Sequence, residues 1–205
     1  MTANALGRDT PYGIYSSFAC YLNETMNGFE YQVAAHMIAE GMVKEGMAIL
    51  KTLDDRYDGN KRNPFNEVEC GDQYGRSMAP YGAFIAATGF TYHGPQKRIG
   101  FAPRVSPENF KAAFTAAEGW GSYAQKITEQ TLEAELVVKY GKVPLRTISL
   151  VPPGGKTPRK VMASLDGKIL AASIREKDGV EEVVLGKEIT LQAGQKLTVT
   201  ISPSG

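Results

Sequence analysis

The chain of 205 residues contains few of the residues on which several classes of protein depend. It has two cysteines, Cys20 and Cys70, and two histidines, His36 and His93. Two cysteines allow at most one disulfide, and two free buried thiols are the favoured interpretation. Two histidines so far apart do not supply the local ligands of a zinc site. The sequence therefore predicts no metal centre.

An excess of charge and a long hydrophobic run are also absent. The net charge of +1 gives no reason to expect nucleic acid or an anionic membrane as a partner. No apolar run approaches the roughly 18 residues of a membrane helix, so no membrane span is expected. The first ten residues contain no signal-peptide core, and the sequence assigns no compartment. A hydrophobic content of 42% is ordinary for one large or two small globular domains.

Helical patterns dominate the first half of the chain. Asn27 followed by Glu30 resembles a capping box, which predicts a helix start at Asn27. The pattern continues to about residue 55, either as one helix or as two helices at 28–40 and 43–56. A third helix is expected at 72–87. The apolar residues cover more than a narrow stripe of these helices, which predicts neighbours on more than one side.

Beyond Gly89 the period of the hydrophobic pattern changes. Residues 90–104 contain a Gly-Pro turn and are interpreted as a hairpin or an irregular excursion. Residues 107–117 are rich in alanine but also alternate, and we interpret them as a strand rather than a helix. Strict alternation then predicts a β-rich segment of about six strands in 131–205, with Asp-Gly turns at 166–167 and 178–179.

Polar side chains crowd into the stretch NPFNEVECGDQYGR, which runs from residue 63 to residue 76. Polar groups just before a helix start usually line a pocket or cap the helix, and the helix N-terminus favours carboxylates. By residue type alone, Glu67 and Arg76 at this spacing more often form a structural ion pair. Asp72 is interpreted as a helix N-cap, and Glu69 as a residue that supports the others.

Several segments in order resemble the end of the catalytic domain of glycoside hydrolase family 116. These segments are GFEYQVAAHMI (28–38), DRYDG (55–59), RNPFNEVECGDQYGRSM (62–78), GFAPR (100–104) and EGWGS (118–122). The family includes bacterial and archaeal β-glucosidases and the animal non-lysosomal glucosylceramidase. The resemblance covers about half of the chain.

The resemblance implies a role for Glu67 and Arg76, because both match family residues that hydrogen-bond the hydroxyls of the glucosyl ring. The family's Glu nucleophile and Asp acid/base lie well upstream, and nothing in residues 1–27 matches their motifs. The chain is therefore expected to provide sugar-positioning residues but no catalytic ones, and to act on a β-glucoside together with a missing N-terminal catalytic half. Asn66, Glu69, Asp72 and Trp120 are supporting candidates. No metal or organic cofactor is implied.

Three positions depart from the family pattern. Gln73 stands where the family often has histidine, Gly75 where alanine is usual, and Pro80 where serine is usual. A proline at position 80 removes the N–H that would bond the carbonyl of Arg76 within a helix. A kink at Pro80 would change the direction of the Arg76 side chain.

The expected fold class is α+β. The resemblance implies that residues 1–125 form the closing sector of an (α/α)6 barrel with three to four helices, because the family has that fold. Alternation predicts a β-rich C-terminal domain in residues 126–205. Trp120, the only tryptophan, can stack on a sugar, although a lone tryptophan between glycines is more often a packing residue. The leading function is the C-terminal part of a retaining β-glycosidase. The alternatives are a stand-alone carbohydrate-binding protein and an interaction protein that uses its β segment.

Overall fold

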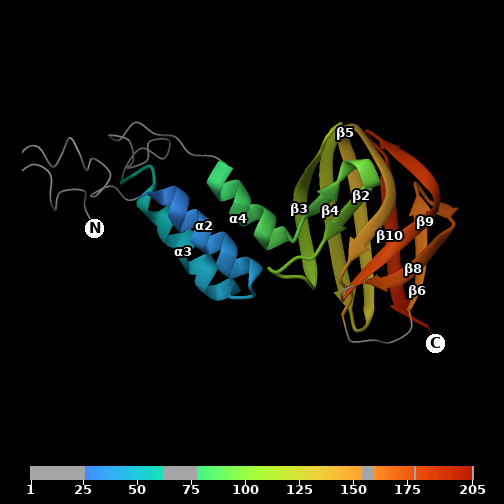
Figure 1. Cartoon of the computed structure of the whole chain (residues 1–205), viewed down its shortest axis with the longest axis horizontal. Helices are drawn as coiled ribbons and strands as arrows, with labels where there is room; N and C mark the ends of the chain where they lie inside the picture. Colours follow the sequence, from blue (N-terminus) through green and yellow to red (C-terminus); the bar gives the residue numbers. More distant parts are fainter. Residues whose placement is uncertain (1–25, 62–77, 154–158, 178, 205) are drawn as a thin grey trace, which may run out of the picture. The chain divides into compact units, whose positions relative to one another are not determined.

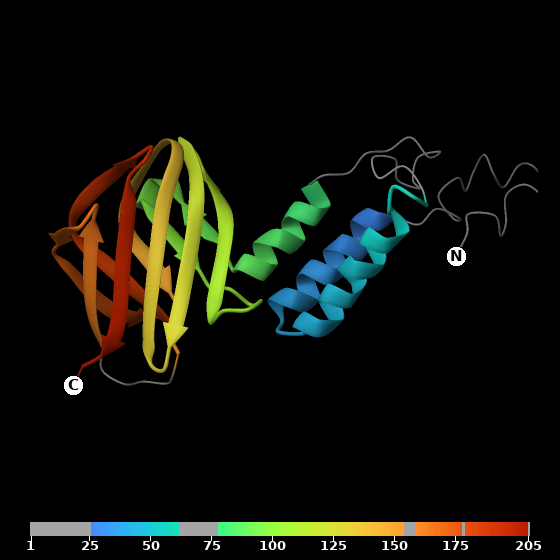
Figure 2. The same cartoon turned by 180° about the vertical axis from the view of Figure 1, so that it is seen from behind.

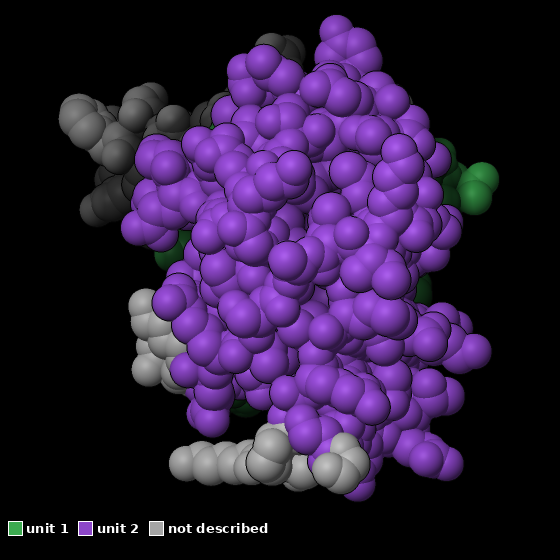
Figure 3. All heavy atoms as spheres, turned by 90° about the vertical axis from the view of Figure 1, so that its right-hand side faces the viewer, with its two compact units in different colours: residues 1–87 green, residues 88–205 purple. Residues whose placement is uncertain are grey.

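The computed structural model describes residues 26–61, 78–153, 159–177 and 179–204. Its contacts divide the chain into two compact units, residues 1–87 and residues 88–205 (Figure 3). The first unit contains an antiparallel helical hairpin and most of a third helix, and the second contains all the described strands (Figure 1). No helix in the described part is long and apolar enough to cross a membrane.

Three α-helices lie in the described residues: α2 (Asn27–Ala39), α3 (Val43–Arg56) and α4 (Met78–Thr88). Gly41 between α2 and α3 has a φ of +88°, a conformation that favours glycine and ends a helix, so two helices form here rather than one. The hairpin packs closely at Gly46, where an added Cβ would lie 2.6 Å from Cγ1 of Ile38. The buried Ala34 and Leu53 belong to the same core.

The predicted capping box at the start of α2 is wrong. The helix begins at Asn27 itself, and its N-cap Met26 makes no side-chain hydrogen bond. Asn27 is buried and accepts a hydrogen bond from Arg56 of α3 at 2.9 Å. The Arg56 guanidinium also forms a fork with Glu30, at 2.6 and 3.0 Å, and this contact raises the pKa of Arg56. The two polar side chains at the helix start therefore hold the end of the neighbouring helix.

The second unit is a ten-stranded mixed sheet folded around one core (Figure 2). Its strands are β1 (Thr91–His93), β2 (Arg98–Phe101), β3 (Asn109–Ala116), β4 (Gly119–Thr128), β5 (Thr131–Leu150), β6 (Arg159–Leu165), β7 (Lys168–Leu170), β8 (Ala172–Lys177), β9 (Val180–Gln192) and β10 (Lys196–Pro203).

The long strand β5 joins the two halves of this sheet. Its first part pairs antiparallel with β4 and β10, and its second part pairs with β9 and, in parallel, with β2. The change of partner occurs around Gly141, which has a φ of +70°. A strand that changes partners at a bend lets one chain segment contribute to both layers around a core. Alternating residues of both parts, such as Leu136 and Leu145, are buried in that core.

The prediction of a partial (α/α)6 barrel is wrong. Strands make up 52% of the described residues, and the helices are three and short. The sheet begins with β1 at Thr91, well before residue 126. The alternating stretch 107–117 also belongs to it, as strand β3. The barrel was implied by the family resemblance, and the wide apolar coverage of α2 and α3 was consistent with it. Two of the apolar side chains concerned are exposed instead, Val33 of α2 and Met42, which precedes α3.

Several local predictions in the β region are confirmed. Residues 90–104 contain the antiparallel hairpin of β1 and β2, with Gly94 and Pro95 in the short 3-10 turn between them. Residues 109–116 form strand β3. The Asp-Gly turn at 166–167 connects β6 to β7, and both of its residues have the positive φ that a tight hairpin turn requires.

Candidate functional site

Most of the predicted site falls outside the described residues. Asn66, Glu67, Glu69, Asp72 and Arg76 all lie in 62–77, as does Cys70, and their roles stay predictions. Pro80 lies within the described turns of α4, and the effect of this proline on Arg76 is also outside what the structure describes. Of the sequence-predicted site residues, Trp120 is the one whose position is known.

Trp120 lies on β4, directly opposite Tyr140 of β5. The two rings are nearly parallel, with an interplanar angle of 19° and centroids 6.5 Å apart. The exposed fractions are 50% for Trp120 and 67% for Tyr140, so neither ring is part of the core. The structure brings Trp120 together with an aromatic partner that sequence reasoning missed.

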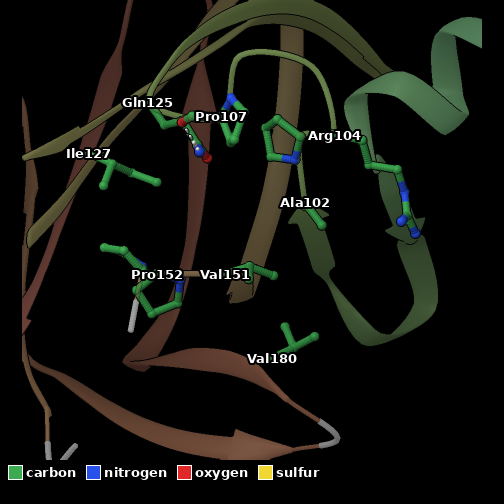
Figure 4. A pocket seen from close by; sticks show the side chains of 10 residues that line it. Ala102, Arg104, Pro107, Gln125, Ile127, Val151, Pro152 and Val180 are labelled. Carbon is green, nitrogen blue, oxygen red and sulfur yellow. Dashed lines mark hydrogen bonds between the residues drawn. The ribbon is translucent and has the colours of Figure 1, made fainter. Parts of the chain in front are cut away.

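A pocket of about 560 Å³ lies within the β unit, where β2 and β5 end and β9 begins (Figure 4). Its volume is within the range of small-molecule sites. Proline and aliphatic side chains make up most of its lining, including Ile127, Val151 and Val180. The polar side chains are the buried Gln125 and the exposed Arg104. The arrangement offers an apolar surface with a guanidinium at its edge, and nothing in the sequence pattern predicted it.

Hydrogen bonds fix the polar wall of this pocket. The Gln125 side chain donates to the carbonyl oxygen of Pro107 at 2.6 Å and accepts from the hydroxyl of Tyr123 at 2.7 Å. Tyr123 is 1% exposed and its ring stacks on Phe101. Burial raises the pKa of the Tyr123 phenol well above its usual value.

Because the phenol of Tyr123 is buried, we expect the free energy of unfolding to fall at alkaline pH. The pKa of Tyr123 is raised in the folded state, whereas an unfolded tyrosine titrates near pH 10. The folded chain therefore retains this proton longer, and its stability falls as the pH rises above about 10. Urea unfolding of Tyr123→Phe should show a pH slope shallower by about 1.4 kcal/mol per unit in that range. An unchanged slope would contradict the assignment.

A cluster of charged side chains lies on the strands β2, β8 and β9. Glu182 is 1% exposed, and its carboxylate contacts Arg98 at 2.8 Å and Arg175 at 2.6 Å. Arg98 also donates to the hydroxyl of the buried Ser149 at 3.0 Å. Two guanidiniums neutralise the carboxylate, so the cluster is suited to holding strands together rather than to proton transfer. Sequence reasoning missed it because its members are far apart along the chain.

Within the described residues no group of three or more His, Cys, Asp or Glu side chains is arranged to hold a metal ion. The described residues therefore contain three candidate features: an exposed aromatic pair, an apolar pocket, and a buried carboxylate paired with two arginines. The first two of these can bind a ligand.

Comparison with known proteins adds little to this picture. No protein-family model matches the chain, and no curated protein shows significant sequence similarity to it. Among solved structures, the alpha-L-rhamnosidase from Dictyoglumus thermophilum, a glycoside hydrolase, is similar over 67% of this chain with a TM-score of 0.35 and 12% identity. The chain spans 16% of that protein.

Proposed function

We propose that the chain is the C-terminal part of a retaining β-glycosidase that resembles the β-glucosidases of glycoside hydrolase family 116. In this proposal the chain helps to bind the sugar whose bond is cleaved and does not hydrolyse a glycoside alone. One observation carries the proposal, the resemblance of RNPFNEVECGDQYGRSM at 62–78 to the sugar-binding motif of that family. The nucleophilic Glu and the acid/base Asp would lie in an N-terminal part of the same protein.

Glu67 and Arg76 carry the proposed binding. The carboxylate of Glu67 accepts hydrogen bonds from two adjacent sugar hydroxyls, and the guanidinium of Arg76 donates in a planar fork. Hydrogen bonds to charged groups contribute more than neutral ones, so these side chains supply much of the affinity for a small polar ligand. Asn66, Glu69 and Asp72 would orient them. The reaction of the whole enzyme requires two carboxyl groups about 5–5.5 Å apart, which the upstream residues provide.

A second candidate function is a stand-alone carbohydrate-binding protein. The observation that favours it is the β unit's own continuous core, which contains large buried side chains such as Phe101, Phe114 and Leu197. A unit with its own core is expected to fold without a catalytic partner. In both candidate functions the chain binds a glucose-type ligand through Glu67, so the same experiment tests that step.

The test is isothermal titration calorimetry of the 205-residue chain with cellobiose. Binding is expected in the unmodified chain, and Glu67→Ala is expected to weaken it by about 10-fold to 100-fold, because about 1.5–3 kcal/mol is lost with hydrogen bonds to a charged group. Arg76→Ala should have an effect of similar size. Glu67→Gln, which retains the shape of the side chain, tests the charge separately.

The matched control is Glu133→Ala, which removes an exposed carboxylate from β5 and should leave the affinity unchanged. Near-ultraviolet circular dichroism establishes that each variant is folded. Equal affinity in the unmodified chain, Glu67→Ala and Arg76→Ala would refute the proposed roles, as would a folded chain that binds no cellobiose.

A further inference from the structure

The exposed aromatic pair of the β unit has a construction that core packing does not require. Trp120 and Tyr140 lie on neighbouring strands with their rings nearly parallel, and half or more of each side chain is exposed. Exposed apolar patches rimmed by polar residues are a feature of ligand-binding sites. Each also combines an apolar ring with a polar N–H or O–H that can bond a ligand.

A β-bulge places Tyr140 beside Trp120. Along β5 the buried residues are at even positions up to Val138, so regular alternation would direct residue 140 into the core. The pairing of β4 with β5 instead shifts by one residue: Gly121 lies opposite Val138, but Trp120 lies opposite Tyr140. The extra residue is Lys139. A shift of one residue moves following side chains to the other face, and Tyr140 is 67% exposed as a result.

Three glycines allow the two strands to approach closely at the bulge. An added Cβ at Gly119 would lie 2.6 Å from the carbonyl oxygen of Tyr140. At Gly121 and Gly141 an added Cβ would overlap the carbonyl oxygens of Val137 and Glu118. The neighbouring atoms are backbone atoms and cannot move aside by changing a rotamer. The two rings therefore lie on paired strands whose backbones approach too closely for a side chain at these three positions.

The surroundings of the pair are polar. Glu118, which precedes β4, and Lys142 of β5 form an ion pair at 3.4 Å with both side chains about half exposed. Ser122 follows Trp120 on the same face of β4. The surface thus combines two apolar ring faces with groups that donate and accept hydrogen bonds. A pyranose ring has the matching chemistry, with an apolar face of C–H groups and a rim of hydroxyls.

We propose that Trp120 and Tyr140 form a carbohydrate-binding site on the β unit, separate from Glu67 and Arg76, that stacks neutral pyranose rings of a glucan. The inference rests on the proposed function for the choice of a glucose-based ligand. The ring pair, the bulge and the glycines that support it are observations of the β unit alone. The site would hold one part of an oligosaccharide. The sugar whose bond is cleaved would lie at the separate site of Glu67 and Arg76.

The chain provides its own probe for this site, because Trp120 is the only tryptophan. Tryptophan emission is followed while cellotetraose is added to the full chain and to Glu67→Ala. A saturable change in emission with the same midpoint in both proteins is the expected result. Calorimetry of Trp120→Ala in the Glu67→Ala background should show a dissociation constant raised by about 30-fold, and Tyr140→Ala one raised by about 3-fold to 10-fold.

The matched control is Met162→Ala, which removes a 58% exposed apolar side chain from the same sheet and should leave binding unchanged. Trp120→Phe keeps a ring and should retain most of the affinity. It serves as the second variant if Trp120→Ala folds poorly. Absence of any change in emission or heat in Glu67→Ala overturns the inference. A change seen in the unmodified chain and lost in Glu67→Ala assigns Trp120 to the Glu67 site and also overturns it. Failure of the Glu67 proposal leaves the Trp120 signal intact, so the two failures are distinguishable.

Discussion

Replacing Arg98 and Arg175 together by methionine is expected to lower the free energy of unfolding of the β unit by about 3–5 kcal/mol. The variant leaves the carboxylate of Glu182, which is 1% exposed, without either of its cationic partners. A buried charge without a partner costs far more than an exposed one, because it has lost its hydration and gained nothing in return. Urea unfolding followed by Trp120 emission reports on the β unit specifically.

The cause is identified by a third substitution. Adding Glu182→Gln to the double variant removes the buried charge and should recover much of the lost stability. The control is Lys97→Met, which breaks the exposed ion pair between Lys97, in the turn before β2, and Glu188 of β9, and should cost less than about 1 kcal/mol. A loss in the double variant no larger than that of the control would show that water reaches Glu182.

Truncation of Phe101 to alanine is expected to cost about 3–5 kcal/mol. The ring is 2% exposed and stacks on Tyr123 with centroids 3.7 Å apart and an interplanar angle of 2°. It also contacts Phe90 and Phe114, at centroid distances of 5.3 and 6.1 Å. The backbone of β2 is held by parallel pairing with β5, so the space left by the ring cannot close easily. The cavity adds to the lost burial of the ring.

The same urea experiment measures this loss. Ile169→Ala on β7 is the matched control, because that side chain is 78% exposed and its truncation should change stability by no more than about 0.5 kcal/mol. If the losses in free energy of unfolding caused by Phe101→Ala and Ile169→Ala differ by less than about 1 kcal/mol, the aromatic cluster is not the centre of the core.

Local features of the fold were predictable where the pattern depends on neighbouring residues. Alternation identified β3 and, at 132–138, 145–149 and 197–201, parts of β5 and β10. A glycine at position 41 with a helical period on both sides allowed the break between α2 and α3. The Asp-Gly pair at 166–167 predicted its hairpin because few other residues adopt a positive φ at both positions.

Features that depend on distant residues were not predictable. Asn27 and Glu30 have the sequence of a capping box, but Arg56 binds both, and the nearby helix end was not visible in the local pattern. The assembly of β1 to β4 with later strands into one sheet likewise depends on β5, which pairs with both groups. The barrel interpretation came from the family resemblance, and the apolar coverage of the helices did not correct it because coverage alone does not specify what packs against a helix.

The candidate site shows the same division. Trp120 was identified by its residue type, whereas its partner Tyr140 depends on a bulge that shifts the alternation by one residue. The glycines at 119, 121 and 141 were a usable signal, because glycines that cluster near an aromatic residue in strands often mark a bulge or a close backbone approach. The roles of Glu67 and Arg76 came from a resemblance, and they stay proposals.

The most direct test of the central proposal is the hydrolysis of an aryl β-glucoside by the purified 205-residue chain. The proposal gives the chain sugar-binding residues but neither the nucleophile nor the acid/base. It therefore predicts that cellobiose binds in a Glu67-dependent manner and that no aryl β-glucoside is hydrolysed above the buffer rate. Turnover by the chain alone that is abolished in Glu67→Ala would contradict the proposal, because it would make this chain a complete enzyme.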